Sequence, residues 1–129
     1  MPPDINLSQY RIEVAQECLD TAKINIDAGQ YKAAANRSYY CVFNAMRGVL
    51  ALDDVDFKKH KGVINYFREN YIKTNIFEKT LSKTLDTLFR VRNASDYDDF
   101  YAISKEEVNE QIEQAEYFLG KVKEYLLKI

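Results

Sequence analysis

Residues 31–52 read YKAAANRSYYCVFNAMRGVLAL, and this stretch decides the fold. Apolar side chains recur in it at spacings of three and four residues, the period of one face of an α-helix. The members of that face are Ala35, Tyr39, Val42, Phe43, Met46, Val49 and Leu50. The alanine triplet at 33–35 would let a neighbouring helix approach closely. We therefore expect a long helix that packs against a second one.

A second helical pattern ends just before this stretch. It consists of two apolar series at helical spacing, which are Leu7, Tyr10, Val14, Cys18 and Ala15, Leu19, Ala22, Ile26. These series predict a helix from about residue 7 to residue 28. Gly29 follows, and glycine commonly stands just past a helix C-terminus. Because only two or three residues separate the two patterns, the helices should form an antiparallel hairpin.

Three further helices are expected downstream. Residues 53–62, DDVDFKKHKG, break the pattern and predict a loop. Inward residues of the next two helices are Val63, Ile64, Phe67 and Tyr71, then Leu81, Leu85, Leu88 and Phe89. The last helix begins at Ser104, which has capping-box spacing to Glu107. Its apolar stripe is either core or a seam against a partner, and it comprises Val108, Ile112, Ala115, Leu119, Val122 and Leu126.

The sequence thus predicts a single all-α domain over residues 1–129, an up-and-down helical bundle of four to five helices. A length of 129 residues suits one domain. The chain has only four glycines and two prolines, which are too few turn-forming residues for a sheet of many strands. We find no internal repeat, low-complexity segment or linker.

Composition limits the partners of this domain. The net charge of −2 excludes a domain-wide basic footprint, so any RNA or nucleotide binding has to come from a local patch. The polar N-terminus and the absence of a long apolar run predict a soluble, cytoplasmic protein that makes no membrane contact. Cys18 and Cys41 are expected as reduced core thiols. With one histidine and no CxxC, neither a metal site nor a cofactor is expected.

The densest polar and aromatic chemistry lies in residues 90–101, RVRNASDYDDFY. We take Arg92, Asn93, Asp96 and Tyr97 as candidate catalytic residues, because an arginine beside an asparagine offers donors suited to a phosphate or carboxylate. Arg92 and Asp96 are four residues apart, so a plain surface ion pair is the alternative. On a straight helix Arg92 and Tyr97 point about 140° apart. They converge only if the helix kinks or ends between them, or if two protomers meet there.

Candidate binding residues lie in two other segments. Arg37 stands near the edge of the apolar face of residues 31–52, one turn before Tyr40; its alternative role is a boundary residue whose stem covers the core. His60, the only histidine, is an acid/base candidate because its ordinary pKa is near neutrality. It lies among lysines that include Lys61, and its alternative role is a residue in a solvated basic turn at the start of a helix.

These segments together resemble the HEPN domain family (higher eukaryotes and prokaryotes nucleotide-binding), especially its small stand-alone prokaryotic members. Residues 37–43 resemble the motif R-x-Y-Y-A-x-F, with Cys41 in place of the alanine. Residues 60–67 resemble H-x-G-x-x-x-x-F, and residues 92–97 resemble R-x-x-x-D-Y. The resemblance spans about residues 8–127, and it implies a homodimeric bundle of four or five helices.

The resemblance also implies a function. Many members are metal-independent ribonucleases that use an arginine and, after four to six residues, a histidine, and their cleavage leaves a cyclic phosphate. Prokaryotic members are often toxins beside a minimal nucleotidyltransferase, which can silence them by transferring AMP to a nearby tyrosine. Tyr97 and Tyr101 are the candidate acceptors. Tyr97 stands where the histidine is expected, and a tyrosine is a poor general base at neutral pH.

We therefore expect the toxin-like, ribonuclease-type half of a HEPN/minimal nucleotidyltransferase toxin–antitoxin pair, with a degenerate catalytic motif. The alternative is a non-catalytic helical module that binds a nucleotide or RNA, or docks a partner. In either case the arginine motif lies near a helix end, where two protomers could pool their arginines.

Overall fold

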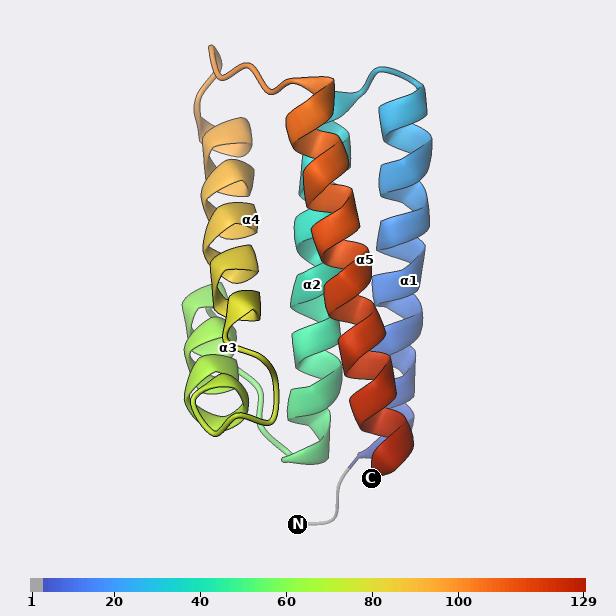
Figure 1. Ribbon diagram of the computed structural model, residues 1–129, viewed down its shortest axis with the longest axis vertical. Coiled ribbons are helices and arrows are strands. Elements are labelled where there is room, and N and C mark those ends of the chain that lie inside the picture. The colour runs from blue at the N-terminus through green and yellow to red at the C-terminus, as the bar shows by residue number, and fades with distance from the viewer. Residues whose placement is uncertain (1–3) are drawn as a thin grey trace.

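The computed structural model describes residues 4–129, which form an all-α bundle (Figure 1). Its α-helices are α1 (Ile5–Asp27), α2 (Tyr31–Leu52), α3 (His60–Phe67), α4 (Thr80–Tyr97) and α5 (Lys105–Lys128). A π-helical turn, η1 (Arg68–Ile72), extends α3. Within residues 4–129 no strand occurs. The all-α bundle predicted from the apolar spacing is confirmed.

The N-terminal hairpin of α1 and α2 forms as predicted. Asp4 caps α1, since its Oδ1 accepts a hydrogen bond of 2.9 Å from the Leu7 N–H. Gly29 follows the helix with a φ of 76°, in the left-handed region that favours glycine. The two helices then pack closely, because a Cβ at Gly48 of α2 would lie 2.8 Å from Ile12 Cδ1 of α1. Small residues at this contact therefore set the helix separation.

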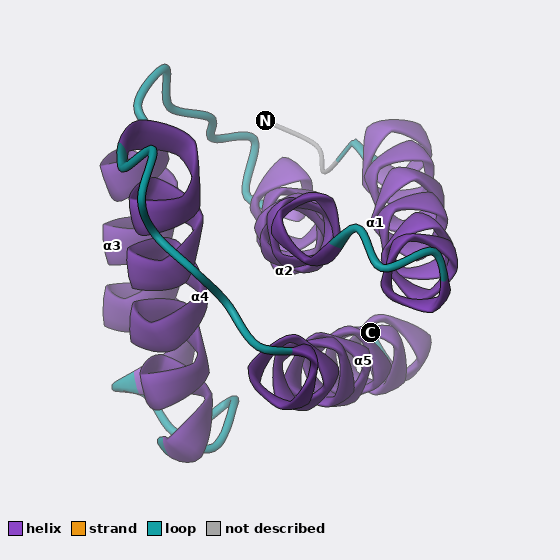
Figure 2. Ribbon diagram, turned by 90° about the horizontal axis from the view of Figure 1, so that it is seen from above, coloured by secondary structure: helices purple, strands orange, loops and turns teal. Residues whose placement is uncertain are grey.

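Helix α2 is the centre of the bundle. It packs against α1, α3, α4 and α5, and the view from above shows α1 and the α3–α4 side on opposite flanks of it (Figure 2). Every residue of its predicted apolar face is buried. Cys18 of α1 and Cys41 of α2 are buried free thiols, as predicted. The contacts of α2 with α1 and α5 therefore fix the position of the α2 face that packs against α4.

The apolar stripe of α5 belongs to the core of this chain. Val108, Ala115 and Val122 are completely buried, and the stripe residues between them are almost so. The helix begins at a capping box, because the Glu107 N–H donates to Ser104 Oγ over 3.1 Å. The structure thereby resolves the two alternatives left open by the spacing in favour of core packing.

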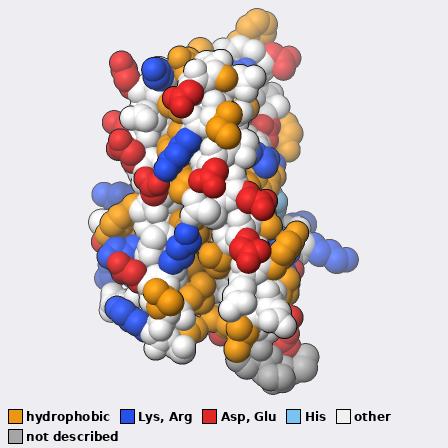
Figure 3. All heavy atoms as spheres, turned by 90° about the vertical axis from the view of Figure 1, so that its right-hand side faces the viewer, with side chains coloured by type: hydrophobic (Ala, Val, Ile, Leu, Met, Phe, Trp, Pro, Cys, Tyr) orange, Lys and Arg blue, Asp and Glu red, His pale blue; other side chains and the backbone are white. Residues whose placement is uncertain are grey.

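The outer surface mixes charges of both signs. On the side formed by α1, acidic and basic side chains are interspersed among apolar ones (Figure 3). None of the helices described here combines the length and the apolar character needed to cross a membrane.

The loop between α2 and α3 is held by a buried arginine that sequence analysis did not single out. Arg11 of α1 donates to the carbonyl oxygen of Arg47 (3.0 Å) and to Asp56 Oδ2 (3.1 Å). Arg47 of α2 donates to the same carboxylate oxygen over 2.9 Å. Since Asp56 is bound to two helices, the loop delivers His60, the first residue of α3, to a fixed place.

Candidate functional site

Arg92 lies at the centre of a cluster built from α2, α3 and α4. Its side chain is only 16% exposed, and Nε lies 2.9 Å from Asp96 Oδ2 in the ion pair that the spacing allows. Nη1 donates to Asn93 Oδ1 over 3.3 Å, and Nη2 reaches α2 to donate to the Tyr40 hydroxyl over 3.0 Å. The ion pair is thus one part of a site between two helices rather than an isolated surface contact.

Tyrosine rings of α2 line the guanidinium. Arg92 Cζ lies 5.4 Å from the ring centroid of Tyr39 and 5.6 Å from that of Tyr40. Arg37 brings a second guanidinium to within 5.2 Å of the Tyr40 centroid, and Asn36 Oδ1 accepts hydrogen bonds from its Nε (3.1 Å) and Nη2 (2.6 Å). Cations at these distances from aromatic rings are held favourably, and more so when water is partly excluded. The result is a concentrated positive charge in an aromatic setting.

His60 joins the cluster from the first turn of α3. Its Nδ1 lies 2.8 Å from the Tyr39 hydroxyl oxygen, and its ring packs on Phe43 with 4.2 Å between centroids. The same ring meets the Tyr40 ring edge-on at 5.8 Å. Three segments that are far apart in the sequence therefore converge on one pair of tyrosines.

The close packing of Phe57 on the first turn of α3 explains why a glycine stands two residues after His60. A Cβ at this position would lie 2.8 Å from the Phe57 Cβ and 2.9 Å from its Cγ. The preceding loop therefore packs directly on the first turn of α3, and the turn that carries His60 can approach α2 closely. A larger residue has to push either the loop or the turn away.

Burial sets the protonation states in the cluster. The pKa of His60 is lowered from its ordinary value, chiefly by burial and further by the positive charges of Arg92 and Arg47. Burial raises the pKa of the Tyr39 hydroxyl well above its usual range, although Arg92 opposes the shift. At neutral pH the cluster therefore presents two guanidinium cations, a neutral imidazole and a protonated Tyr39. This combination can attract an anion and accept a proton.

The structure does not bring every predicted residue to Arg92. Helix α4 continues to Tyr97, so Tyr97 points away from Arg92, as a straight helix requires, and it is 79% exposed. Tyr101 packs partly against the core, and Lys61 is exposed next to His60. Of the predicted residues, Arg92, Asn93, Asp96, Arg37, Tyr40 and His60 form one connected cluster.

Tyr39 is the site residue that sequence analysis did not name as a candidate, although it lies on the predicted apolar face and within the motif of residues 37–43. Only 2% of Tyr39 is exposed. Its hydroxyl nevertheless contacts His60, and its ring contacts Arg92. A signal was present in the sequence. Adjacent tyrosines lie about 100° apart around a helix, so the pair Tyr39 and Tyr40 covers a corner between core and surface.

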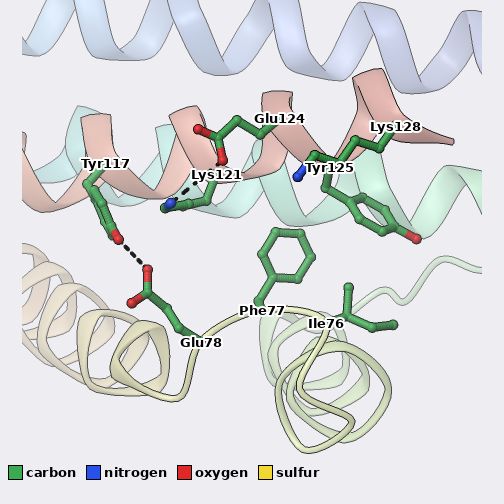
Figure 4. A pocket seen from close by; sticks show the side chains of 8 residues that line it. All are labelled: Ile76, Phe77, Glu78, Tyr117, Lys121, Glu124, Tyr125 and Lys128. Atoms are coloured by element: carbon green, nitrogen blue, oxygen red, sulfur yellow. Dashed lines mark hydrogen bonds and ion pairs between the residues drawn. The ribbon is translucent and has the colours of Figure 1, made fainter.

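A separate cavity of about 420 Å³ lies between α5 and the segment before α4 (Figure 4). Its polar groups largely satisfy one another. The Tyr117 hydroxyl points towards Glu78 and donates to it, and Lys121 pairs with Glu124 at 3.6 Å. No residue of the three motif segments lines this cavity. The Arg92 cluster is therefore the stronger candidate for the functional site.

Comparisons with known proteins agree with the motifs. A family model described as the HEPN domain matches residues 8–125, a range that contains all three motif segments. The "UPF0332 protein" of Thermotoga maritima is 32% identical over 118 residues, which cover 92% of this chain and 89% of that protein. "Putative toxin MJ0142" of Methanocaldococcus jannaschii is 31% identical over 116 residues (90% and 79%). "Putative toxin MJ0605" of the same organism is 30% identical over 121 residues (94% and 90%).

Proposed function

This chain belongs to the HEPN domain family, and we propose that it is the toxin-type half of a pair with a minimal nucleotidyltransferase. We propose further that its Arg92 cluster binds and cuts single-stranded RNA. The names of the two Methanocaldococcus jannaschii relatives support a toxin role. The geometry around Arg92 supports the chemistry.

The observation that carries the proposal is the way in which Arg92 is held. An ion pair to Asp96, a hydrogen bond to Tyr40 and two aromatic rings fix its guanidinium in a partly desolvated place. Fixed positive charge is suited to the dianionic phosphorane that forms when RNA is cleaved, because no reorganisation is needed at the moment of reaction. Arg37 supplies a second guanidinium beside the same ring.

RNA suits this site better than a small anion does. Guanidinium planes and aromatic rings are the groups on which proteins stack the bases of unpaired RNA, and the half-buried Arg37 and Tyr40 offer both at the edge of the cluster. The 2′-hydroxyl of RNA can attack the adjacent phosphorus and leave a 2′,3′-cyclic phosphate. DNA lacks that hydroxyl, so the proposed reaction is specific for RNA.

An assay with a single-stranded RNA oligonucleotide tests this function. We expect the purified protein to cut it in the presence of EDTA, to leave cyclic phosphate ends, and to leave DNA of the same sequence intact. Arg92→Ala should lower kcat/KM at least about 100-fold, in the range seen when a transition-state donor is removed. Arg90→Ala is the matched control, because Arg90 is exposed and two residues away, and it should retain activity.

Two outcomes contradict the proposal. One is a wild-type protein that neither cuts nor binds RNA with or without added metal. The other is an Arg92→Ala protein that unfolds under the assay conditions, which would assign Arg92 to structure. Thermal unfolding of both arginine variants separates the second outcome from loss of function.

A second candidate function, a non-catalytic module that docks and is modified by a partner, is supported by the segment after Arg92. Tyr97 is 79% exposed and Phe100 is 96% exposed, and Asp98 and Asp99 accompany them. A nucleotidyltransferase can reach the Tyr97 hydroxyl, which would attack the α-phosphorus of ATP, release pyrophosphate and take up AMP. Tyr101 is less accessible, so Tyr97 is the preferred acceptor.

Co-expression with the nucleotidyltransferase that we expect to be encoded by the adjacent gene tests this candidate. The intact mass should rise by the mass of AMP residues in the wild type and in Tyr101→Phe, whereas Tyr97→Phe should stay unlabelled. Labelling that persists in Tyr97→Phe and disappears in Tyr101→Phe would reverse the assignment. A wild type that is never labelled, or an adjacent gene of another kind, would count against the partner.

A further inference from the structure

We propose that His60 is the proton acceptor for RNA cleavage at the Arg92 cluster, and that Tyr39 is the positioning residue that fixes its imidazole. This inference rests on the proposed ribonuclease function and names a residue for a step that the arginine motif leaves unfilled. Tyr97 occupies the expected place of a histidine in that motif, but it points to solvent. His60 is the only histidine in the chain, and the fold brings it to Arg92 from a different helix.

His60 and Arg92 lie against the same two tyrosine rings. The His60 ring centroid is 5.7 Å from the Tyr39 centroid and 5.8 Å from the Tyr40 centroid. The corresponding distances from Arg92 Cζ are 5.4 and 5.6 Å. Both groups therefore border the same pair of rings, and Arg92 is close enough for its charge to act on the imidazole. In the proposed complex, the Arg92 guanidinium binds the scissile phosphodiester, and the 2′-hydroxyl of the ribose that carries this phosphate on its 3′-oxygen faces the imidazole.

The contact with Tyr39 leaves the other ring nitrogen available. Tyr39 is protonated and buried, and its oxygen can accept a hydrogen bond from Nδ1–H of His60 at the observed 2.8 Å. In this tautomer Nε2 carries the lone pair, and no hydrogen bond joins Nε2 to a residue between 4 and 129. When Nε2 takes up a proton, Nδ1–H keeps its acceptor. Tyr39 thus orients the base and stabilises its charged form.

The charged groups around His60 keep it neutral before the reaction. Arg92 approaches from α4, and Arg47 and the two tyrosines approach from α2. Lys61, the next residue of α3, is exposed to solvent. The charges among these neighbours are positive, so together with burial they disfavour the imidazolium form. A general base has to be deprotonated at the working pH, and this environment meets that requirement.

The proposed step is an internal transfer at phosphorus. His60 Nε2 takes the 2′-hydroxyl proton, the 2′-oxygen forms a bond to phosphorus, and the bond from phosphorus to the 5′-oxygen breaks. The departing 5′-oxygen takes a proton from water, and the imidazolium later returns its proton to water. The products are a 2′,3′-cyclic phosphate and a 5′-hydroxyl, so protons and charge balance. Arg92 stabilises the charge on the two non-bridging oxygens.

Kinetics of His60→Gln test the role of the imidazole. General base catalysis typically contributes about 100-fold or more, so kcat/KM should fall by that factor. Wild-type kcat/KM should rise with pH through an apparent pKa below about 6.5, the ordinary value for histidine. This rising limb of the pH profile should vanish in His60→Gln. Lys83→Gln is the matched control, because it removes an exposed cation of α4 that lies outside the cluster, and it should keep the pH dependence of the wild type.

Nuclear magnetic resonance supplies a readout that does not depend on activity. Because the chain has one histidine, the ¹⁵N shifts of its imidazole report the tautomer and the pKa directly. We expect the Nδ1–H tautomer and a pKa below the ordinary value. Tyr39→Phe removes the acceptor of Nδ1–H, so it should lower this pKa further and move the kinetic limb to lower pH. This measurement also covers the case in which His60→Gln does not fold.

The outcomes separate the inference from the proposed function. If the wild type cuts no RNA, both are overturned. If the wild type cuts RNA while a folded His60→Gln retains its rate and its pH limb, only the role of His60 is overturned. An Nε2–H tautomer in the free protein, or a Tyr39→Phe variant with an unchanged imidazole pKa and pH limb, overturns the assignment of Tyr39.

Discussion

Arg92 Nη2 donates to the hydroxyl oxygen of Tyr40 over 3.0 Å, although 52 residues separate the two in the chain. The contact joins α4 to α2 across the site and turns a local ion pair into part of a larger structure. An isolated pair at four-residue spacing is worth only a few tenths of a kcal/mol. The added hydrogen bond and ring contacts define where the guanidinium points, and a phosphate-binding arginine depends on that direction.

Tyr40→Phe should separate this direction from stability. Loss of one partly buried hydrogen bond costs about 0.5–1.5 kcal/mol of unfolding free energy. The RNA cleavage rate should fall about tenfold or more, because the guanidinium loses its acceptor on α2. Tyr66→Phe is the control, since it removes the hydrogen bond of 3.1 Å to Asp53 outside the site. Urea unfolding and a cleavage assay on both variants check the prediction, and equal activities would contradict it.

Two glycine-to-alanine substitutions should act in opposite directions. In Gly62→Ala the new Cβ meets Phe57, so we expect a loss of about 1–3 kcal/mol in unfolding free energy and a displaced His60. Gly120→Ala in α5 meets nothing within 4 Å and should stabilise the protein by up to about 1 kcal/mol. Thermal melts measure both. If Gly62→Ala melts no lower than the wild type, the loop does not hold α3 in the way described.

The contact of Asp56 with two arginines should make stability depend on pH. Partial burial alone would raise the pKa of Asp56, but hydrogen bonds from Arg47 and the Phe57 N–H, with the charge of Arg11, outweigh it and hold the pKa below its usual range. The stabilisation is therefore complete above the unfolded pKa of about 4 and is lost as pH falls through the lower folded value.

Asp56→Asn checks this sign. The variant should unfold at lower urea concentration than the wild type at neutral pH, and the difference should shrink below about pH 4 as the wild-type carboxylate is protonated. Asp86→Asn, at an exposed ion pair with Arg68, is the control. A difference between Asp56→Asn and wild type that stays constant down to the acid transition would contradict the assignment.

Light scattering at micromolar concentration should report a dimer, as the family resemblance implies. If the arginine motifs of two protomers meet near the C-terminal end of α4, Phe100→Ser should lower the mass towards that of one chain. Its side chain is 96% exposed, so the unfolding free energy of the monomer should change by no more than about 0.5 kcal/mol. Leu127→Ser is the control, because Leu127 is 87% exposed in the last turn of α5, and α4 and α5 end at opposite ends of the bundle (Figure 1).

Two results would contradict parts of this prediction. A wild-type mass equal to one chain removes the dimer itself. A dimer that survives Phe100→Ser but not Leu127→Ser places the interface at the opposite end, near the last turn of α5.

Helix positions and the core followed from the sequence because they depend on local spacing. The apolar face of residues 31–52, the capping box at Ser104 and the stop at Gly29 each involve residues within a few turns of one another. Apolar side chains at helical spacing have one low-energy outcome in water, which is burial on a shared face. The three motifs likewise marked Arg37, His60 and Arg92 before any contact between them was visible.

The tertiary structure alone decided which of these residues meet. Arg92 and Tyr97 are neighbours in sequence, yet a continuous α4 points them apart, whereas Tyr39 and His60 come together from different helices. Such contacts depend on how α3 and α4 pack on α2, and that packing is set by distant residues, including the buried Arg11 that holds the loop before His60. Periodicity describes one helix at a time, so it assigns a side chain to a face but does not specify its partner on another helix.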